Sequence, residues 1–394
     1  MSSSHNGTAL LPLNYHLQVV EYLRRHEPEV WHWAAKRNTH TEQLETLRTA
    51  LLRDTYRIDA EAHPDIHAAL SLAIERLGID APATLYQSPG EMNATLVYVP
   101  GEIHIILQGP LLERLSTDEL LAVFGHELSH YLLWSRDEGS FLIADRILND
   151  TLTNSDAISH RETYRRYVLH TEIFADRGSA IAADAMAPAV SALVKVSTGM
   201  SMVDAAAYLR QAAEIEAKET SSSAALSHPE TFIRARALAQ WWENSPDLEL
   251  WITSRLHGPL SLERLDLPAQ VHMQELTRGF LAHYLSDTEL ASEAVLAQLR
   301  MMFPDWSEQE NPIGPESFGP KAADDSVRGY LNALMVDLAL ADPDQQDVAL
   351  VRAGQVAQTL GSFEALQQNL RRDAGFGKRE MDKYKRQLAK ETQK

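Results

Sequence analysis

The sequence predicts an α+β protein that is mostly helical, with a small β-sheet or hairpin beside one central helix and a helical C-terminal region. Three observations predict this class. Apolar residues recur at helical spacing along much of the chain. Two short runs rich in β-branched residues, 95–99 and 103–107, are separated by a Pro-Gly-Glu turn at 100–102. Shortly after them, Ser116 opens a further helical pattern with a strong start signal.

The composition limits the classes of function. The chain has 394 residues, enough for two or three domains and a large core. It carries 36 Lys and Arg against 55 Asp and Glu, a net charge of −19 at pH 7. We therefore expect the protein to repel nucleic acid and anionic membrane surfaces. It has no Cys, which excludes disulfides and thiolate metal sites.

Changes in composition divide the chain into three parts. Residues 1–57 have a helical pattern and are expected to form an N-terminal helical segment. Residues 58–245 hold the motifs with a chemical meaning and are expected to form one domain. Residues 246–394 are expected to form a helical C-terminal region, interrupted at 306–326 by a loop or linker rich in Pro, Gly and acidic residues.

The chain shows no membrane-spanning pattern. Residues 1–10 lack the basic segment and the apolar run of a signal peptide. The most apolar longer stretch, 180–194, is interrupted by Asp184 and Pro188. We therefore expect no membrane span, and a cytoplasmic protein is the simplest interpretation.

Short elements precede the central helix. Residues 61–77 have a helical pattern that ends at Gly78, and 83–86 read as a short strand. The runs 95–99 and 103–107 then predict a hairpin or a bent pair of strands. An ordinary buried hairpin fits these runs as well as one at a sheet edge.

The central helix begins with a capping box. Ser116 is followed three residues later by Glu119, a pair that satisfies orphan amides at a helix start. Apolar residues then recur at helical spacing through Leu132. Gly125 leaves room for the close approach of another backbone.

Within this helix, residues 126–130 read His-Glu-Leu-Ser-His. Residues four apart lie on one helix face, so His126 and His130 are predicted to bind one metal ion together. Glu127, beside the first ligand, is predicted to act as a general base on a water molecule. The alternative is an amphipathic core helix whose two His residues are incidental.

A zinc site of this kind needs a third protein ligand and an open fourth position. The best candidate is Glu172, and His170 is a rival. Asp176 lies one turn after Glu172 and is predicted to accept the N–H of a ligand imidazole, which fixes its tautomer. The alternative is two solvated carboxylates on a surface helix, although apolar neighbours such as Ile173 and Phe174 indicate a buried face.

These motifs resemble the gluzincin metallopeptidases of the HtpX, CAAX-prenyl-protease and Oma type. The resemblance covers about residues 60–240 and rests on three segments in the same order. They are the motif at 126–130 with its leader Leu115–Leu120, the segment Glu172–Arg177, and Ser227-His228-Pro229 followed by Arg234. Many relatives have membrane-spanning helices near the catalytic core, and this chain departs from them in having none evident.

The resemblance implies a zincin-type core, one Zn²⁺ per chain and zinc-dependent endopeptidase activity on a protein or peptide substrate. It also implies that a strand before the central helix is an exposed edge that pairs with the substrate backbone. His228 would then donate to the oxyanion that develops in the transition state. The alternative is a purely structural role, in which Ser227 caps a helix and Pro229 lies in its first turn. Arg234 is interpreted as a structural ion-pair residue.

Other functions stay open from the sequence. One alternative is a peptidase-like scaffold that keeps zinc as a structural ion and binds a protein partner through the C-terminal helices. The intact Glu127 argues against that interpretation, because a structural zinc site needs no base. A third reading is a latent peptidase whose cleft is covered by the N-terminal helices or by residues 137–160. The tail from Arg371 is net basic, so a regulatory partner docking there would be acidic.

Overall fold

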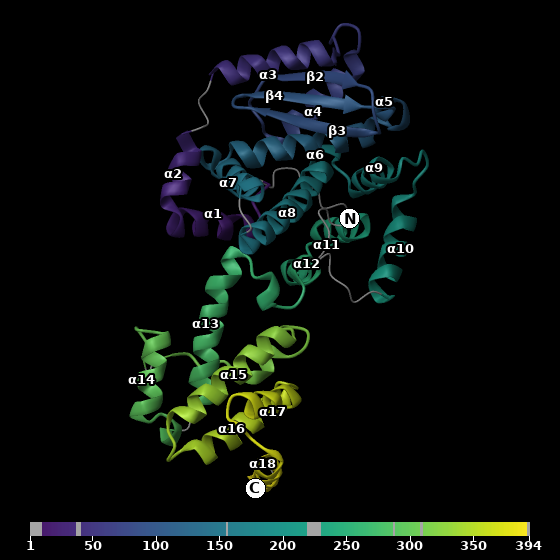
Figure 1. The fold of residues 1–394 in the computed structure, drawn as a ribbon. Helices are drawn as coiled ribbons and strands as arrows, with labels where there is room; N and C mark the ends of the chain where they lie inside the picture. Colours follow the sequence, from purple (N-terminus) through teal and green to yellow (C-terminus); the bar gives the residue numbers. More distant parts are fainter. Residues whose placement is uncertain are drawn as a thin grey trace. The chain divides into compact units, whose positions relative to one another are not determined.

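The computed structural model describes residues 10–36, 41–154, 157–218, 230–286, 288–307 and 310–391. The chain divides into two compact units, Met1–His257 and Gly258–Lys394 (Figure 1). The described residues are mostly helical and contain one small sheet, so the predicted α+β class is confirmed at that level. The boundaries at residues 57 and 245 stay predictions. Among the described helices, none is long and apolar enough to cross a membrane.

The first unit holds the sheet and the motif-bearing helices. Its strands are β1 (Tyr56–Arg57), β2 (Ala83–Ser88), β3 (Asn93–Val99) and β4 (Glu102–Gln108). Its described helices are α1 (Asn14–His26), α2 (Pro28–Lys36), α3 (Thr41–Asp54), α4 (Pro64–Leu77), α5 (Leu111–Arg114), α6 (Thr117–Ser135), α7 (Ser140–Asn154), α8 (Ile158–Ala183), α9 (Met186–Thr198), α10 (Ala205–Lys218), α11 (Thr231–Trp242) and α12 (Leu248–His257), and a 3₁₀ turn lies at Asp137–Gly139.

The strands form a mixed sheet in the order β1-β2-β4-β3. The predicted hairpin is confirmed, since β3 and β4 pair antiparallel from Asn93↔Gln108 to Val99↔Glu102. Gly101 in the connecting turn has a φ of 79°, which a residue without Cβ adopts at little cost. β2 joins β4 in parallel, so β3 is left at one edge of the sheet.

The two faces of the sheet have different neighbours. Leu96 and Ile105 lie on the face that shares one hydrophobic core with α4 and α6. Side chains alternate along a strand, so Tyr86 and His104 lie on the opposite face, where their side chains are 3.3 Å apart. The helix α3 is tied to the sheet by an ion pair in which Arg48 Nη2 lies 2.7 Å from Glu102 Oε1.

The capping box at the start of α6 is confirmed. Ser116 Oγ accepts from the Glu119 amide at 3.3 Å, and Glu119 Oε2 accepts from the Ser116 amide at 2.8 Å. The same carboxylate is buried and forms an ion pair with Lys195 of α9 at 2.8 Å. This single residue therefore both begins α6 and fixes it to α9.

Two glycines bring α6 and α8 into close contact. A Cβ added at Gly125 would lie 2.6 Å from the Gly178 carbonyl oxygen, and one at Gly178 would lie 1.7 Å from Ser129 Oγ. Such contacts are too short for any larger residue without displacement of a helix. The close approach predicted at Gly125 is confirmed, and it brings α8 next to the motif.

The N-terminal helices are an integral part of this unit. His16 of α1 is fully buried, and its Nε2 lies 3.1 Å from Thr171 Oγ1 of α8. Glu27 Oε1, just after α1, lies 2.8 Å from His160 Nε2 of α8. The helix α7 packs its apolar residues between 141 and 148 inward.

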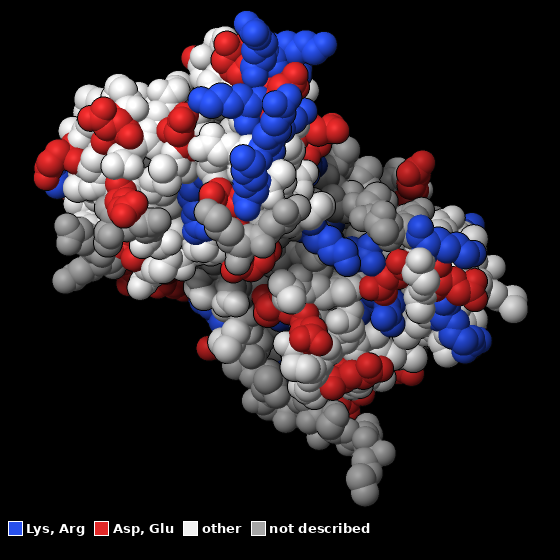
Figure 2. All heavy atoms as spheres, turned by 90° about the horizontal axis from the view of Figure 1, so that it is seen from below, with Lys and Arg blue, Asp and Glu red and all other residues white. Residues whose placement is uncertain are grey.

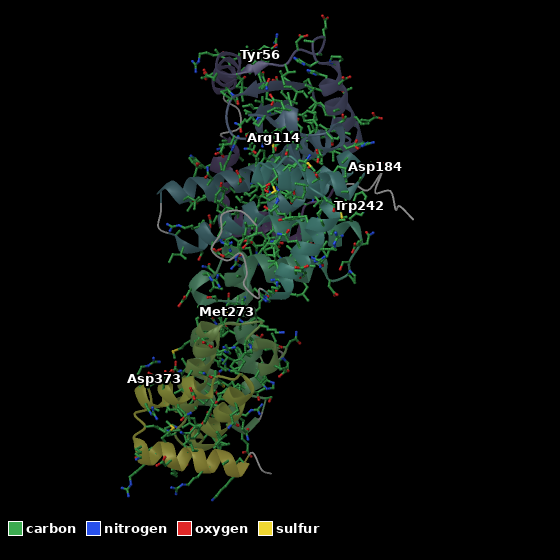
Figure 3. All side chains as sticks on the ribbon, turned by 90° about the vertical axis from the view of Figure 1, so that its right-hand side faces the viewer. Tyr56, Arg114, Asp184, Trp242, Met273 and Asp373 are labelled. Carbon is green, nitrogen blue, oxygen red and sulfur yellow. The ribbon has the colours of Figure 1, made fainter. Side chains whose placement is uncertain are left out.

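The second unit is helical. It contains α13 (Leu267–Tyr284), α14 (Glu293–Met302), α15 (Asp325–Ala341), α16 (Gln346–Thr359), α17 (Phe363–Arg372) and α18 (Lys378–Glu391), with short 3₁₀ turns at Leu262–Arg264, Thr288–Leu290 and Pro315–Phe318. Apolar side chains from these helices form one core (Figure 3). The Pro- and Gly-rich segment lies within this unit, where Phe318 is 1% exposed and belongs to that core.

The last helix, α18, has one apolar side and one basic side. Its buried residues are Met381, Tyr384 and Leu388. On the opposite side, exposed basic residues recur at spacings of four, three and four, which place them in one stripe. We call this the basic stripe: Arg379, Lys383, Arg386 and Lys390. Figure 2 shows a band of Lys and Arg side chains on the face seen from below.

Candidate metal centre

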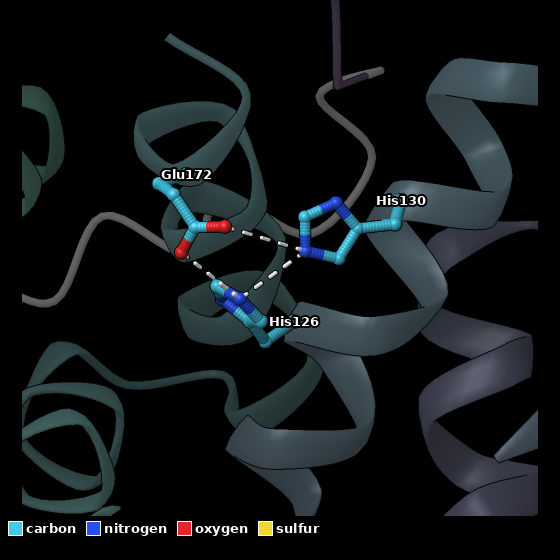
Figure 4. A group of neighbouring side chains, drawn as sticks. All are labelled: His126, His130 and Glu172. Atoms are coloured by element: carbon cyan, nitrogen blue, oxygen red, sulfur yellow. Dashed lines mark hydrogen bonds and ion pairs between the residues drawn. The ribbon is translucent and has the colours of Figure 1, made fainter. Parts of the chain in front are cut away.

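The two motif histidines lie one turn apart on α6. Their Nε2 atoms are 3.3 Å apart, and their ring planes are inclined at 80° (Figure 4). Regular helical geometry alone brings residues four apart onto one face. The capping box and the glycine contact with α8 keep this stretch of α6 helical and position it.

Glu172 of α8 completes a group of three donors. Its Oε2 lies 3.6 Å from His126 Nε2, and its Oε1 lies 3.9 Å from His130 Nε2. Tetrahedral zinc with bonds of about 2.1 Å holds its ligand atoms roughly 3.4 Å apart, so these separations fit a zinc ion. Between 13% and 18% of each of the three side chains is exposed, so the group is reachable from solvent.

Asp176 and Arg234 surround this group with charge. Asp176 Oδ1 lies 3.3 Å from His126 Nδ1, a contact that leaves His126 Nε2 as the lone-pair donor. Arg234 of α11 donates to both Asp176 oxygens, at 2.6 and 2.8 Å, and its Nη1 lies 2.9 Å from Glu172 Oε2. One guanidinium therefore bridges the buried carboxylate of Asp176 and the partly exposed carboxylate of Glu172.

Arg234 also decides the ionisation of both carboxylates. Burial is the largest single influence and would raise the pKa of Asp176 and of Glu172, but Arg234 together with His126 outweighs it at Asp176, and Arg234 together with His126 and His130 outweighs it at Glu172, so both pKa values are lowered. Burial lowers the pKa of His130 to about 4, which favours its neutral form. Neutral imidazole and ionised carboxylate are the forms that bind metal ions.

Glu127 points from α6 to the edge strand. Its Oε2 accepts a hydrogen bond of 2.8 Å from the Leu96 amide of β3. The side chain is buried, and burial raises the pKa of this carboxyl group above its ordinary value. The hydrogen bond fixes one oxygen of the carboxylate and brings β3 beside the candidate metal centre.

Two other histidines named from the sequence have different places. His170 is outside the three-donor group, with its Nε2 2.9 Å from His257 Nε2 and its ring stacked on Tyr15 at 4.6 Å. His228 lies outside the described residues, together with Ser227 and Pro229. The candidate ligand group among the described residues is therefore His126, His130 and Glu172.

Sequence reasoning did not foresee three contacts around this group. It treated Arg234 as structural without naming its partners, and it did not identify the Leu96 amide. It also gave no role to Trp134, whose ring lies 5.6 Å from that of His130. The spacing of four residues between His130 and Trp134 was the available signal, since such residues share a helix face.

Part of the chain is similar to known metallopeptidases. Residues 60–153 match the model of Peptidase family M48, a range that contains α6 and ends before α8. The chain is also similar to the Plastoglobule-localized metallopeptidase 48, chloroplastic, of Arabidopsis thaliana, at 29% identity over 51% of this chain.

The match spans 63% of the length of that relative. No solved structure matches the chain significantly. Residues 60–153 are therefore similar to Peptidase family M48, and the chain also brings together a His-His-Glu group that could hold a metal ion.

Proposed function

We propose that this chain is a zinc-dependent endopeptidase of the gluzincin type, with a zincin-type core. In this proposal His126, His130 and Glu172 hold one zinc ion, and Asp176 orients His126. The observation that carries it is the convergence of three donor atoms from α6 and α8 at separations suited to zinc, with Glu127 adjacent. A structural zinc site would not need that additional carboxylate.

The reaction then follows from the positions of the side chains. A bound zinc ion would polarise the scissile carbonyl and make water a stronger nucleophile. Glu127 Oε1 takes a proton from the attacking water, while the Leu96 amide holds Oε2 in place. The protonated carboxyl group then gives that proton to the leaving amine nitrogen and returns to its ionised form. The raised pKa of buried Glu127 suits a group that must both take and give a proton.

The substrate is an extended polypeptide segment paired with β3. Backbone groups of a strand alternate in direction, and the Leu96 amide faces Glu127 rather than β4. The backbone groups of Ala94 and Tyr98 therefore also face away from β4. These groups provide an edge to which a peptide can add as a further strand.

We assign His228 as a donor to the developing oxyanion. The support is its position in the chain, six residues before Arg234, which itself contacts Glu172. The helix α11 that carries Arg234 begins at Thr231, close after His228. An imidazole that donates a hydrogen bond to the scissile carbonyl oxygen would stabilise the negative charge that develops there.

A partner-binding scaffold is the second candidate function, and the basic stripe favours it. The helix α18 carries six Lys and Arg against three Asp and Glu, in a chain of net charge −19. A narrow stripe of cations on a strongly acidic protein suits an acidic polypeptide better than a large polyanion. A regulatory protein partner would dock on the basic stripe. We also propose a cytoplasmic location.

Metal content provides the first test. The purified protein is expected to contain about one equivalent of zinc. His126→Ala is expected to lose most of it, because only two of the three protein ligands remain. The matched control is His272→Ala, since His272 is 60% exposed on α13. Elemental analysis checks both variants. Equal zinc in the two variants would contradict the ligand assignment.

A further inference from the structure

Three aromatic side chains lie beside the candidate metal centre. The ring of Tyr98 on β3 lies 5.7 Å from that of Tyr131 and 5.9 Å from that of Trp134, both on α6. The Trp134 ring in turn lies 5.6 Å from the ring of His130. We call Tyr98, Tyr131 and Trp134 the aromatic trio. It connects the edge strand to one of the candidate metal ligands.

The trio offers a partly exposed aromatic surface. Tyr131 is buried, with 6% of its surface exposed, whereas Tyr98 and Trp134 are half-buried. The indole nitrogen of Trp134 is buried, so the exposed part of this side chain is carbon. A half-buried aromatic surface next to a reaction centre gains most by covering itself with another apolar group.

The direction of β3 shows which side of the cleaved bond lies toward this surface. Leu96 contacts Glu127, and Tyr98 lies two residues further along the strand on the same face. A peptide in the favoured antiparallel pairing runs opposite to β3. Its residues on the N-terminal side of the cleaved bond therefore lie toward Tyr98, and those on the C-terminal side lie toward Ala94.

Charge distinguishes between the possible occupants. Aromatic faces also bind cations, so a basic side chain is the natural competitor of an apolar one. A charged side chain held against these half-buried rings would lose part of its hydration, and an apolar side chain does not pay that cost. The surroundings therefore favour an uncharged occupant.

We propose that the aromatic trio is a substrate subsite for a large apolar side chain, such as Leu, Met or Phe, on the N-terminal side of the cleaved bond. The inference rests on the proposed peptidase function and specifies its substrate class. Burial of one such side chain against aromatic rings is expected to raise the affinity for the peptide by roughly 10-fold to 100-fold.

Binding tests the subsite without catalysis. Glu127→Gln protein loaded with zinc would be mixed with fluorescent Gly- and Ser-rich peptides that differ in one central residue, and anisotropy would give each Kd. The Phe and Leu peptides are expected to bind at least about tenfold tighter than the Ala and Arg peptides. Adding Trp134→Ala or Tyr98→Thr should reduce this ratio below about threefold, with zinc content unchanged.

The matched control is Trp33→Ala, since Trp33 lies on α2 and is 54% exposed. It should leave the ratio unchanged. Equal binding of all peptides, tighter binding of the Arg peptide, or an unchanged ratio after both Trp134→Ala and Tyr98→Thr would each overturn the subsite.

Cleavage mapping tests the side of the bond. Wild-type protein would digest a mixture of unfolded proteins, and mass spectrometry would locate the cuts. Large apolar residues are expected to be enriched on the N-terminal side of the cut, and enrichment only on its C-terminal side would overturn the assigned register. A complete lack of cutting would count against the proposed peptidase function, whereas the binding experiment would still decide the subsite.

Discussion

Glu127→Gln is expected to lower peptidase activity by at least about 10²-fold and up to about 10⁴-fold, with zinc content and folding preserved. Gln has nearly the same shape as Glu but does not accept the proton of the attacking water. Its side-chain carbonyl still accepts the Leu96 amide that now bonds Glu127 at 2.8 Å. The substitution therefore removes the base and keeps the local structure.

Exposed Glu113 on α5 provides the matched control, because Glu113→Gln makes the same chemical change away from the candidate metal centre. Initial rates on a fluorescent peptide mixture, with zinc measured in each sample, give the comparison. Equal cutting by wild type and Glu127→Gln would point to a contaminating protease. Absence of cutting by both would favour the scaffold function.

Arg234→Met is expected to destabilise the metal-free protein by about 3–5 kcal/mol, because it leaves the buried carboxylate of Asp176 and the partly buried carboxylate of Glu172 without their shared cation. Arg236→Met is the matched control on the same helix. Arg236 is 29% exposed and pairs with Glu216 at 2.9 Å, so its loss should cost about 1 kcal/mol or less. Urea unfolding in the presence of a chelator measures both values.

The loss caused by Arg234→Met should also depend on pH. In the wild type, Arg234 lowers the pKa of Asp176 and of Glu172, so both groups stabilise the fold above about pH 4–5, near their unfolded values. Without Arg234, burial raises both pKa values, and the fold loses stability as pH rises. The difference between variant and wild type should therefore be larger at pH 7.5 than at pH 5. An equal difference at both pH values would contradict the assigned role of Arg234.

Local patterns predicted the elements that carry the candidate metal centre. The capping box at Ser116 and Glu119 sets the start of α6 by hydrogen bonds within four residues, so the sequence alone specifies it. The β3–β4 hairpin is likewise local, since its turn contains a glycine at positive φ. The spacing of His126 and His130 determines their common face in any helix.

Contacts between distant segments could not be predicted from local sequence patterns. The parallel pairing of β2 with β4, which leaves β3 at the edge, depends on how the whole sheet assembles. Arg234 reaches Asp176 from 58 residues away in the sequence, and no periodic pattern specifies such a contact. Glu172 was the favoured third ligand because it shares a helix face with Asp176, and its apolar neighbours indicated a buried face, but only the packing of α8 on α6 separates it from His170.

The most direct test of the central claim is the hydrolysis of unfolded casein before and after removal of zinc. The protein would be assayed as purified, after dialysis against a chelator, and after addition of one equivalent of zinc. We expect cutting in the first sample, loss of at least about 99% of it in the second, and recovery in the third, because zinc supplies the Lewis acid. Cutting that persists without zinc in the protein, or that Glu127→Gln retains in full, would contradict the assignment of a zinc-dependent peptidase.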